Sequence, residues 1–253
     1  IVQHALGESR YVRPFAYDFF DTVLCCGPLV KQNIRRIEAI RKLPQKELLE
    51  TGVPHYDELV RRAAEIPAAA RATTVLVAPS WGPCSLFTNF GTGFVRDIAA
   101  RYPVIVRPHP QMRVSQSRLY EEILSIEGVT VDTETTPSRA MASADIVLSD
   151  ISGIAYEFTF LYEKPVLVVD LDVGVGGLEG HLLRDVPSLR QLCSDFVEVV
   201  PPSEVPRLPE RIAEALSRSS AERIARGREA FVYNYGQAGA VAARQIEEIL
   251  ACL

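Results

Sequence analysis

A short polar run follows a predicted buried strand, and its residue types suit phosphate binding. The segment VIVRPHP (104–110) contains Arg107 and His109, which alternate along an extended chain and therefore face the same side. Arginine presents a planar fork of donors to phosphate oxygens, and histidine supplies a donor or a proton that titrates near neutral pH. The neighbouring prolines remove backbone donors and end the strand. We therefore expect Arg107 and His109 at the end of a strand, facing a ligand.

A second polar run, SDISG, stands between an apolar strand and a helix-like stretch. Ser149 or Asp150 could cap the helix, which would make this an ordinary tight turn. Alternatively, Ser152 and Gly153 would let a phosphate oxygen approach the free amides and positive dipole at the start of the helix. The motif alone leaves both readings open.

Other polar residues allow both a functional and a structural interpretation. Glu157 lies in the predicted helix after SDISG, where it would accept hydrogen bonds from ribose hydroxyls or lie on the surface. His4 ends a predicted strand and is a candidate general base, although a structural histidine fits the local pattern better. Ser80 and Trp81 close another strand, so Trp81 either lines a cleft or seals the core. The four histidines are far apart and form no metal-binding motif, so we expect no metal site.

Composition and charge describe an ordinary globular chain. It has 253 residues, 47% of them hydrophobic, and a net charge of −5, which argues against a general electrostatic hold on nucleic acid. Five cysteines without a CxxC pair suit a reducing compartment. No apolar run approaches the ~20 residues that span a bilayer. We expect a cytoplasmic location, with peripheral contact at the inner face of the membrane as a second expectation, and a chain that is part of a longer protein.

Short β-branched strands alternate with amphipathic helices, which predicts an α/β fold with a doubly wound parallel sheet. Such a sheet binds its ligands at the carboxyl ends of the strands. The strands are expected at 73–80, 103–110, 129–132, 145–150, 164–170 and 196–200.

The expected organisation is one near-complete Rossmann-like domain and the tail of a second. Residues 1–71 are expected to be the tail of a separate α/β unit, with strands at 1–6 and 21–27 and a basic helix at 29–43. Residues 72–208 are expected to form the larger domain. Residues 209–253 form C-terminal helices that pack back across the interface, expected at 209–217, 220–231 and 237–251.

These segments, in this order, resemble a known family. QHALGES, TGVPHYDEL, VIVRPHP, ADIVLSDISGIAYEF and NYGQAGAVAARQIEEIL resemble the CDP-glycerol glycerophosphotransferases of teichoic-acid synthesis and related capsule polymerases. The resemblance covers most of the chain and implies the GT-B fold, in which two Rossmann-like domains face a cleft. It implies that residues 1–71 are the remnant of the acceptor-side domain and that residues 72–208 are the nucleotide-donor domain. RPHP and SDISG are its most specific parts.

The resemblance also implies roles for the candidate residues. His4 matches the proposed base that activates the acceptor hydroxyl, and Arg107 and His109 match an element at the donor phosphates. Asp150, Ser152 and Gly153 match the family's element that holds the pyrophosphate at a helix N-terminus. Glu157 matches an acidic residue that the family often has toward the nucleotide ribose.

The chain departs from the family pattern at three places. The turn after His4 reads ALGES, Gly153 stands where the family has a second serine, and DVGVGGLEG replaces the usual loop after Asp170. These departures leave the donor and the acceptor open.

The sequence therefore predicts a transferase that moves a polyol-phosphate group, such as glycerol phosphate, from a CDP-activated donor to an acceptor hydroxyl in cell-wall or capsular polymer synthesis. No cofactor is expected, and the partners are the nucleotide donor and a polyol-phosphate, lipid-linked or glycan acceptor. One alternative is a GT-B glycosyltransferase or a relative of the UDP-sugar 2-epimerases. Another is a non-catalytic nucleotide-binding fragment.

Overall fold

The structure is a computed structural model that describes residues 6, 9–66, 72–171, 174 and 177–251. The contacts between residues divide the chain into two compact units. Unit 1 comprises residues 1–61, 174–193 and 225–253, and unit 2 comprises residues 62–173 and 194–224. The units do not follow the predicted domain boundaries, because 174–193 and 225–253 group with the N-terminal residues and 209–224 groups with the larger sheet.

Unit 2 contains a six-stranded parallel sheet in the order β5-β4-β3-β6-β7-β8. Each strand lies within a predicted strand, and this confirms the doubly wound sheet. The first two strands of the unit in chain order, β3 and β4, are neighbours, and β6 pairs with the other side of β3. The sheet therefore has a topological switch point between β3 and β6. The strands are β3 (Val75–Val77), β4 (Val104–Val106), β5 (Thr130–Val131), β6 (Ile146–Ser149), β7 (Val166–Val169) and β8 (Val197–Val200).

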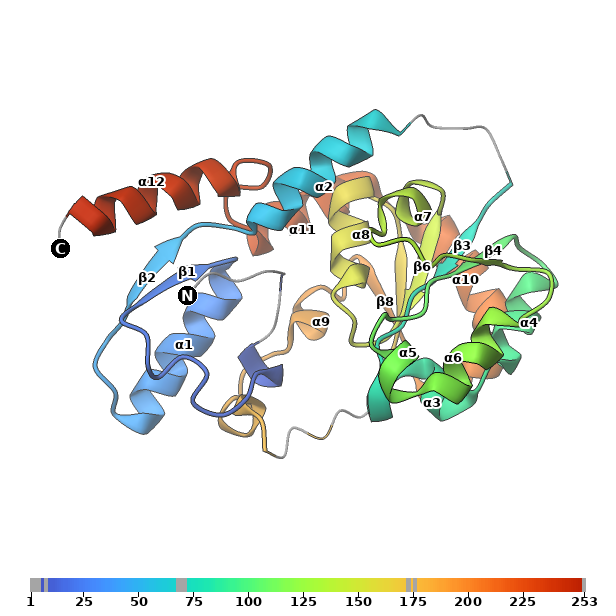
Figure 1. Cartoon of the computed structure of the whole chain (residues 1–253), viewed down its shortest axis with the longest axis horizontal. Helices are drawn as coiled ribbons and strands as arrows, with labels where there is room; N and C mark the ends of the chain where they lie inside the picture. The colour runs from blue at the N-terminus through green and yellow to red at the C-terminus, as the bar shows by residue number, and fades with distance from the viewer. Residues whose placement is uncertain (1–5, 7–8, 67–71, 172–173, 175–176, 252–253) are drawn as a thin grey trace. The chain divides into compact units, whose positions relative to one another are not determined.

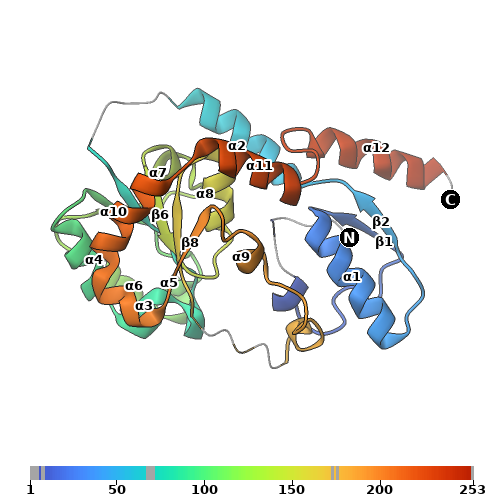
Figure 2. The ribbon, with the colours of Figure 1, turned by 180° about the vertical axis from the view of Figure 1, so that it is seen from behind.

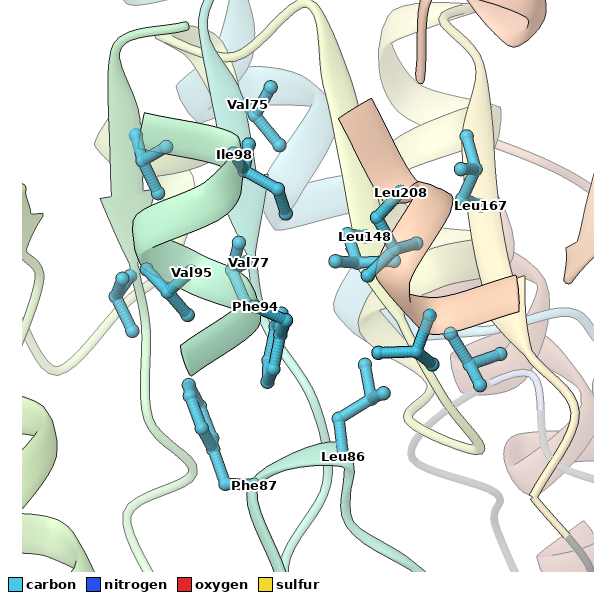
Figure 3. Close-up of a cluster of buried hydrophobic side chains, with 14 of the residues drawn as sticks. Val75, Val77, Leu86, Phe87, Phe94, Val95, Ile98, Leu148, Leu167 and Leu208 are labelled. Carbon is cyan, nitrogen blue, oxygen red and sulfur yellow. The ribbon is translucent and has the colours of Figure 1, made fainter. Parts of the chain in front are cut away.

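Alternate side chains of these strands pack on opposite faces of the sheet, so helices cover both. On one face, Val75, Val77 and Leu148 belong to a cluster that includes Ile98 of α4 (Gly93–Ala99) and Leu208 of α10 (Leu208–Arg218) (Figure 3). On the other face, α8 (Ile154–Tyr162) packs against β6 and β7 (Figure 1). Burial on both faces explains the nearly uninterrupted apolar runs of the strands.

The helices of unit 2 alternate with its strands, as Figures 1 and 2 show from opposite sides. Residues 93–99, 117–124, 138–142 and 154–162 confirm the helices expected between the strands. The full set is α3 (Leu86–Phe90), α4 (Gly93–Ala99), α5 (Met112–Ser115), α6 (Ser117–Leu124), α7 (Ser138–Ala142), α8 (Ile154–Tyr162) and α10 (Leu208–Arg218), with 3-10 turns η2 (Gly82–Cys84) and η4 (Pro202–Arg207).

Unit 1 contains a two-stranded parallel sheet formed by β1 (Thr22–Cys25) and β2 (Glu47–Glu50). The structure confirms the predicted strand at 21–27 and the predicted helix at 29–43, whereas β2 was not predicted. Its sequence, ELLE, has two charged residues in four and therefore lacks the apolar pattern that predicts a strand. The predicted strand at 1–6 lies almost entirely outside the described residues.

The last two helices of the chain lie close to their predicted bounds. One of them, together with several other elements, belongs to unit 1, and the other is divided between the units. The set is η1 (Ser9–Tyr11), α1 (Pro28–Arg41), η3 (Glu179–Leu182), α9 (Leu189–Leu192) and α12 (Ala238–Ala251), while α2 (Pro54–Glu65) and α11 (Ala221–Phe231) each extend from one unit into the other. In the described part of the chain, no helix is both long and apolar enough to cross a membrane.

The TGVPHYDEL segment holds the C-terminal residues of unit 1. Asp57 accepts hydrogen bonds from the Ala238 amide at 3.2 Å and the Gly239 amide at 2.7 Å, and so caps the start of α12. Gly52 has a φ of 94°, and a Cβ there would lie 2.2 Å from the Tyr233 carbonyl oxygen. Contacts within unit 1 therefore explain why Gly52 and Asp57 stand in this segment.

Candidate functional site

The candidate site lies in unit 2, where the carboxyl ends of β3, β4 and β6 meet. Trp81 follows β3, His109 follows β4, and Ser152 follows β6, on both sides of the switch point. The crevice at such a point is where open α/β sheets bind their ligands. The parallel order therefore brings together segments that are about 30 to 70 residues apart in sequence.

His109 stands beside Trp81, with ring centroids 6.1 Å apart. Its Nδ1 accepts a hydrogen bond from the Gln111 amide at 3.1 Å, so the proton of the neutral ring is on Nε2. Burial, and then the charge of Arg107, lower the pKa of His109 below its usual range. At neutral pH His109 is therefore a neutral ring that can donate a hydrogen bond from Nε2.

Arg107 is paired with an acidic residue. Its Nη1 lies 2.5 Å from Oδ2 of Asp132, and both side chains are only 10% exposed. Asp132 follows β5 directly, and its Oδ1 accepts a hydrogen bond from the Glu134 amide. Arg107 therefore reaches the site in a fixed position, with part of its charge balanced by Asp132.

Asp150 joins the segments that follow β3 and β6. Its Oδ1 accepts hydrogen bonds from the amides of Ser80 (2.8 Å) and Ser152 (3.3 Å), and its Oδ2 accepts one from Leu86 (3.0 Å). The side chain is buried, which raises its pKa, while these hydrogen bonds oppose the rise. The structure thus places Asp150 under the site as a support for the turn, and its predicted contact with a phosphate stays a prediction.

The helix α8 begins without a side-chain cap. The prediction that Ser149 or Asp150 would cap it is wrong, because Ser149 Oγ donates to the Ala78 carbonyl at 2.8 Å and Asp150 binds the amides described above. Gly153 is the cap residue, and no heavy atom lies within 4 Å of a Cβ built there. The start of α8 therefore has a positive dipole end and open space at Gly153, the arrangement that an anion needs, while the Ala155 and Tyr156 amides donate to the Ser152 and Gly153 carbonyls.

Glu157, on the first turn of α8, is largely shielded from water. Burial raises its pKa to about 7, and the nearby charge of Arg107 opposes the rise. Glu157 is therefore half-buried and is not one of the exposed surface residues. Near neutral pH this carboxyl group can either donate or accept a hydrogen bond, which suits a ligand hydroxyl.

The loop after β3 is fixed at two points. Gln116 Oε1 accepts a hydrogen bond from the Gly82 amide at 2.9 Å, and Gln116 Nε2 donates one to Thr88 at 2.8 Å. Together with the bond from Ser80 to Asp150, these contacts hold Trp81 in place with 44% of its surface exposed. Trp81 thus offers an aromatic face next to His109 and does not seal the core.

The structure brings together Arg107, His109, Ser152, Gly153 and Glu157 with Ser80 and Trp81. His4 lies outside the described residues, so its role as a base stays a prediction. Among the described residues, no group of three or more His, Cys, Asp and Glu side chains is placed to hold a metal ion.

Sequence reasoning missed Asp132 and Gln116. Asp132 had a usable signal, because it stands directly at the carboxyl end of the predicted strand VTVD, the neighbour of the strand that ends in Arg107. Gln116 gave none, since an isolated glutamine before a helix is common in loops.

The sheet order and the position of the site define a Rossmann-type α/β protein, the type of domain that GT-B proteins contain. The chain belongs to the CDP-glycerol:poly(glycerophosphate) glycerophosphotransferase family, whose model matches residues 30–237. The matched range contains the RPHP and SDISG segments. No curated protein matches the sequence.

Solved structures with the same fold include the wall teichoic acid polymerase TagF, with a TM-score of 0.55 and 16% identity over 91% of this chain and 59% of that chain. A TagF variant soaked with CDPG gives a TM-score of 0.54, with 16% identity over 90% of this chain and 56% of that chain. The UDP-GlcNAc 2-epimerase from Neisseria meningitidis, bound to UDP-GlcNAc, gives 0.51, with 17% identity over 90% of this chain and 61% of that chain. The chain therefore spans less than two thirds of the length of these structures.

Proposed function

We propose that the chain binds the CDP-activated donor for a transferase that moves a glycerol-phosphate-type group to an acceptor hydroxyl in cell-wall or capsular polymer synthesis. The observation that carries the proposal is the uncapped start of α8 at the same edge of a Rossmann-ordered sheet as His109, where the switch point lies. Membership in the glycerophosphotransferase family supports the same donor class.

The proposed reaction is a phosphoryl transfer. An acceptor oxygen attacks the β-phosphorus of the donor, the bond from that phosphorus to the bridging oxygen breaks, and CMP leaves. The acceptor proton passes to a base, for which His4 is the predicted residue. Negative charge that grows on the bridging oxygen is stabilised by fixed donors placed where it develops.

In this proposal the chain's own groups supply the donors and the positive charge. The Nε2–H of His109, the hydroxyl of Ser152 and the amide of Gly153 bind the diphosphate oxygens, and Arg107 adds positive potential. Glu157 binds a ribose hydroxyl. The acceptor is a polyol phosphate, lipid-linked or glycan hydroxyl, and a cytoplasmic location with peripheral membrane contact stays a prediction.

The first prediction concerns nucleotide binding, measured by titration calorimetry with CDP-glycerol, CDP-ribitol and UDP-GlcNAc. We expect CDP-glycerol to bind, and His109→Ala to weaken it by about tenfold or more, since one charge-assisted hydrogen bond contributes about 1.5–3 kcal/mol. The control is His55→Ala, an exposed histidine on α2 that is expected to leave the affinity unchanged. Absence of binding by all three nucleotides, or equal affinity in His109→Ala, would contradict the proposal.

The same measurement separates the alternatives. Preferential binding of UDP-GlcNAc would favour the glycosyltransferase or epimerase reading. A transfer assay with polyol-phosphate acceptors, analysed by mass spectrometry of the products, tests the remaining alternative. Binding of CDP-glycerol without any transfer product would favour a nucleotide-binding module.

A further inference from the structure

Asp132 contacts the candidate site through Arg107. Asp132 and Arg107 form an ion pair, and the side chain of each is only 10% exposed. Asp132 is itself held by two backbone contacts, since its amide donates to the Val106 carbonyl at 2.8 Å and its Oδ1 accepts from the Glu134 amide at 3.0 Å. A carboxylate fixed in this way, after the strand next to β4, sets the position of the guanidinium group.

A second carboxyl group, that of Glu157, lies near the same guanidinium group. Glu157 lies close enough for the charge of Arg107 to act on it, yet the ion pair found for Arg107 is with Asp132. If Arg107 paired with Glu157 instead, Glu157 would be held charged and its oxygens would be occupied. The site would then lose a carboxyl group that can meet a ligand hydroxyl.

We propose that Asp132 is a positioning residue of the donor site, which keeps Arg107 from pairing with Glu157 and so leaves the Glu157 carboxyl group free for the ligand. The value of this arrangement for catalysis rests on the proposed function. The arrangement itself can be tested without a ligand.

Charged and titratable side chains follow several strands at this edge. They are Arg107 and His109 after β4, Asp132 and Glu134 after β5, Asp150 after β6, Glu157 on α8 and Asp170 after β7. Among the described residues, Arg107 is the charged group that acts on the Glu157 carboxyl. A change at Asp132 should therefore reach Glu157 only through Arg107.

The test follows the titration of Glu157 by NMR, with ¹³C in the glutamate side-chain carboxyl groups and Glu157→Gln to identify the signal. In Asp132→Asn, Arg107 is free to pair with Glu157, so we expect the midpoint to fall by about one pH unit or more. Asp132→Glu keeps the charge and should stay closer to the wild type. Asp145→Asn removes a carboxylate that pairs with Lys164 at the amino end of β6, and it should leave the midpoint unchanged.

The Arg107→Gln background shows whether the effect passes through Arg107. There the Glu157 midpoint should rise above its wild-type value, and Asp132→Asn should add little. An unchanged midpoint in Asp132→Asn would overturn the proposal, and so would an equally large fall in the Arg107→Gln background. If Asp132→Asn does not fold, a fall in Asp132→Ser supports the proposal and an unchanged midpoint there overturns it.

A parallel titration with CDP-glycerol links the arrangement to function. At pH 7 we expect Asp132→Asn and Glu157→Gln each to weaken binding by about tenfold, and Asp145→Asn to leave it unchanged. If the wild type does not bind CDP-glycerol, the proposed function fails, while the Glu157 titration still decides the role of Asp132.

Discussion

Glu157 shows at the scale of one residue how surroundings set chemistry. A glutamate ordinarily titrates near 4.5, but burial brings the pKa of Glu157 to about 7 in the folded chain. The protonated form is therefore favoured by folding. The contribution of protonated Glu157 to the free energy of unfolding is fully present below the pKa of the unfolded chain. It is lost as the pH rises through the folded pKa of about 7.

A stability measurement can test this. The rise from 4.5 to about 7 corresponds to about 3 kcal/mol of unfolding free energy at most. The wild type loses this contribution between pH 5 and pH 8, whereas Glu157→Gln does not. The stability of the variant minus that of the wild type should therefore be about 2–3 kcal/mol larger at pH 8 than at pH 5. Urea unfolding of both proteins at the two pH values checks the prediction. The same stability difference at pH 5 and pH 8 would contradict the raised pKa.

His109 and Trp81 show the complementary case, in which neighbours orient a ring. The Gln111 amide fixes the tautomer of His109, and the pinned loop after β3 holds Trp81 beside it. Neither residue would be in place if the two strands did not end at the same edge of the sheet.

At the scale of elements, one carboxylate joins α2 to the start of α12. The bonds from the Ala238 and Gly239 amides to Asp57 satisfy donors that α12 cannot satisfy itself, and the charge suits the positive end of the helix. Asp57→Ala should therefore destabilise unit 1 by about 1–2 kcal/mol.

The control for this change is Glu58→Ala on the same helix. Glu58 forms an exposed ion pair with Arg61, so its loss should change the free energy of unfolding by less than about 1 kcal/mol. Thermal unfolding of both variants measures the difference. An Asp57→Ala protein as stable as Glu58→Ala would show that the cap contributes nothing.

Asp150 has a similar role between strand ends. By accepting amides from the segments after β3 and β6, it fixes the turn from which α8 starts. With Asp150 engaged in this way, the first turn of α8 has no carboxylate as a cap, and its positive dipole end stays open to an anion.

At the scale of the molecule, unit 1 is assembled from three separated stretches of the chain. Residues 225–253 belong to it together with 1–61 and 174–193. The close approach of Gly52 to the Tyr233 carbonyl and of Gly27 to the Phe231 carbonyl shows how tightly the last stretch is packed.

Removal of the C-terminal residues should therefore affect the units unequally. In a chain that ends at residue 230, we expect amide hydrogen exchange to accelerate in β1 and β2, while β3 and β6 of unit 2 stay protected. Hydrogen exchange followed by mass spectrometry gives this comparison. Unchanged protection of β1 would show that residues 231–253 do not contribute to unit 1.

The sequence by itself determined the sheet of unit 2, most of its helices and the segments that form the site. Apolar periodicity reports which strands are buried, and a polar run at a strand end can be recognised locally, as for Arg107 and His109. The short strand ELLE lacks that signal, so β2 was missed.

Only the tertiary structure decided what each polar residue contacts. Whether Ser149 and Asp150 cap α8 depends on donors and acceptors from β3, and the partner of Arg107 comes from the end of β5. These contacts join residues 25 to 71 positions apart, and local patterns carry no information about such pairs. The raised pKa of Glu157 has the same origin, because burial depends on everything that packs around the side chain.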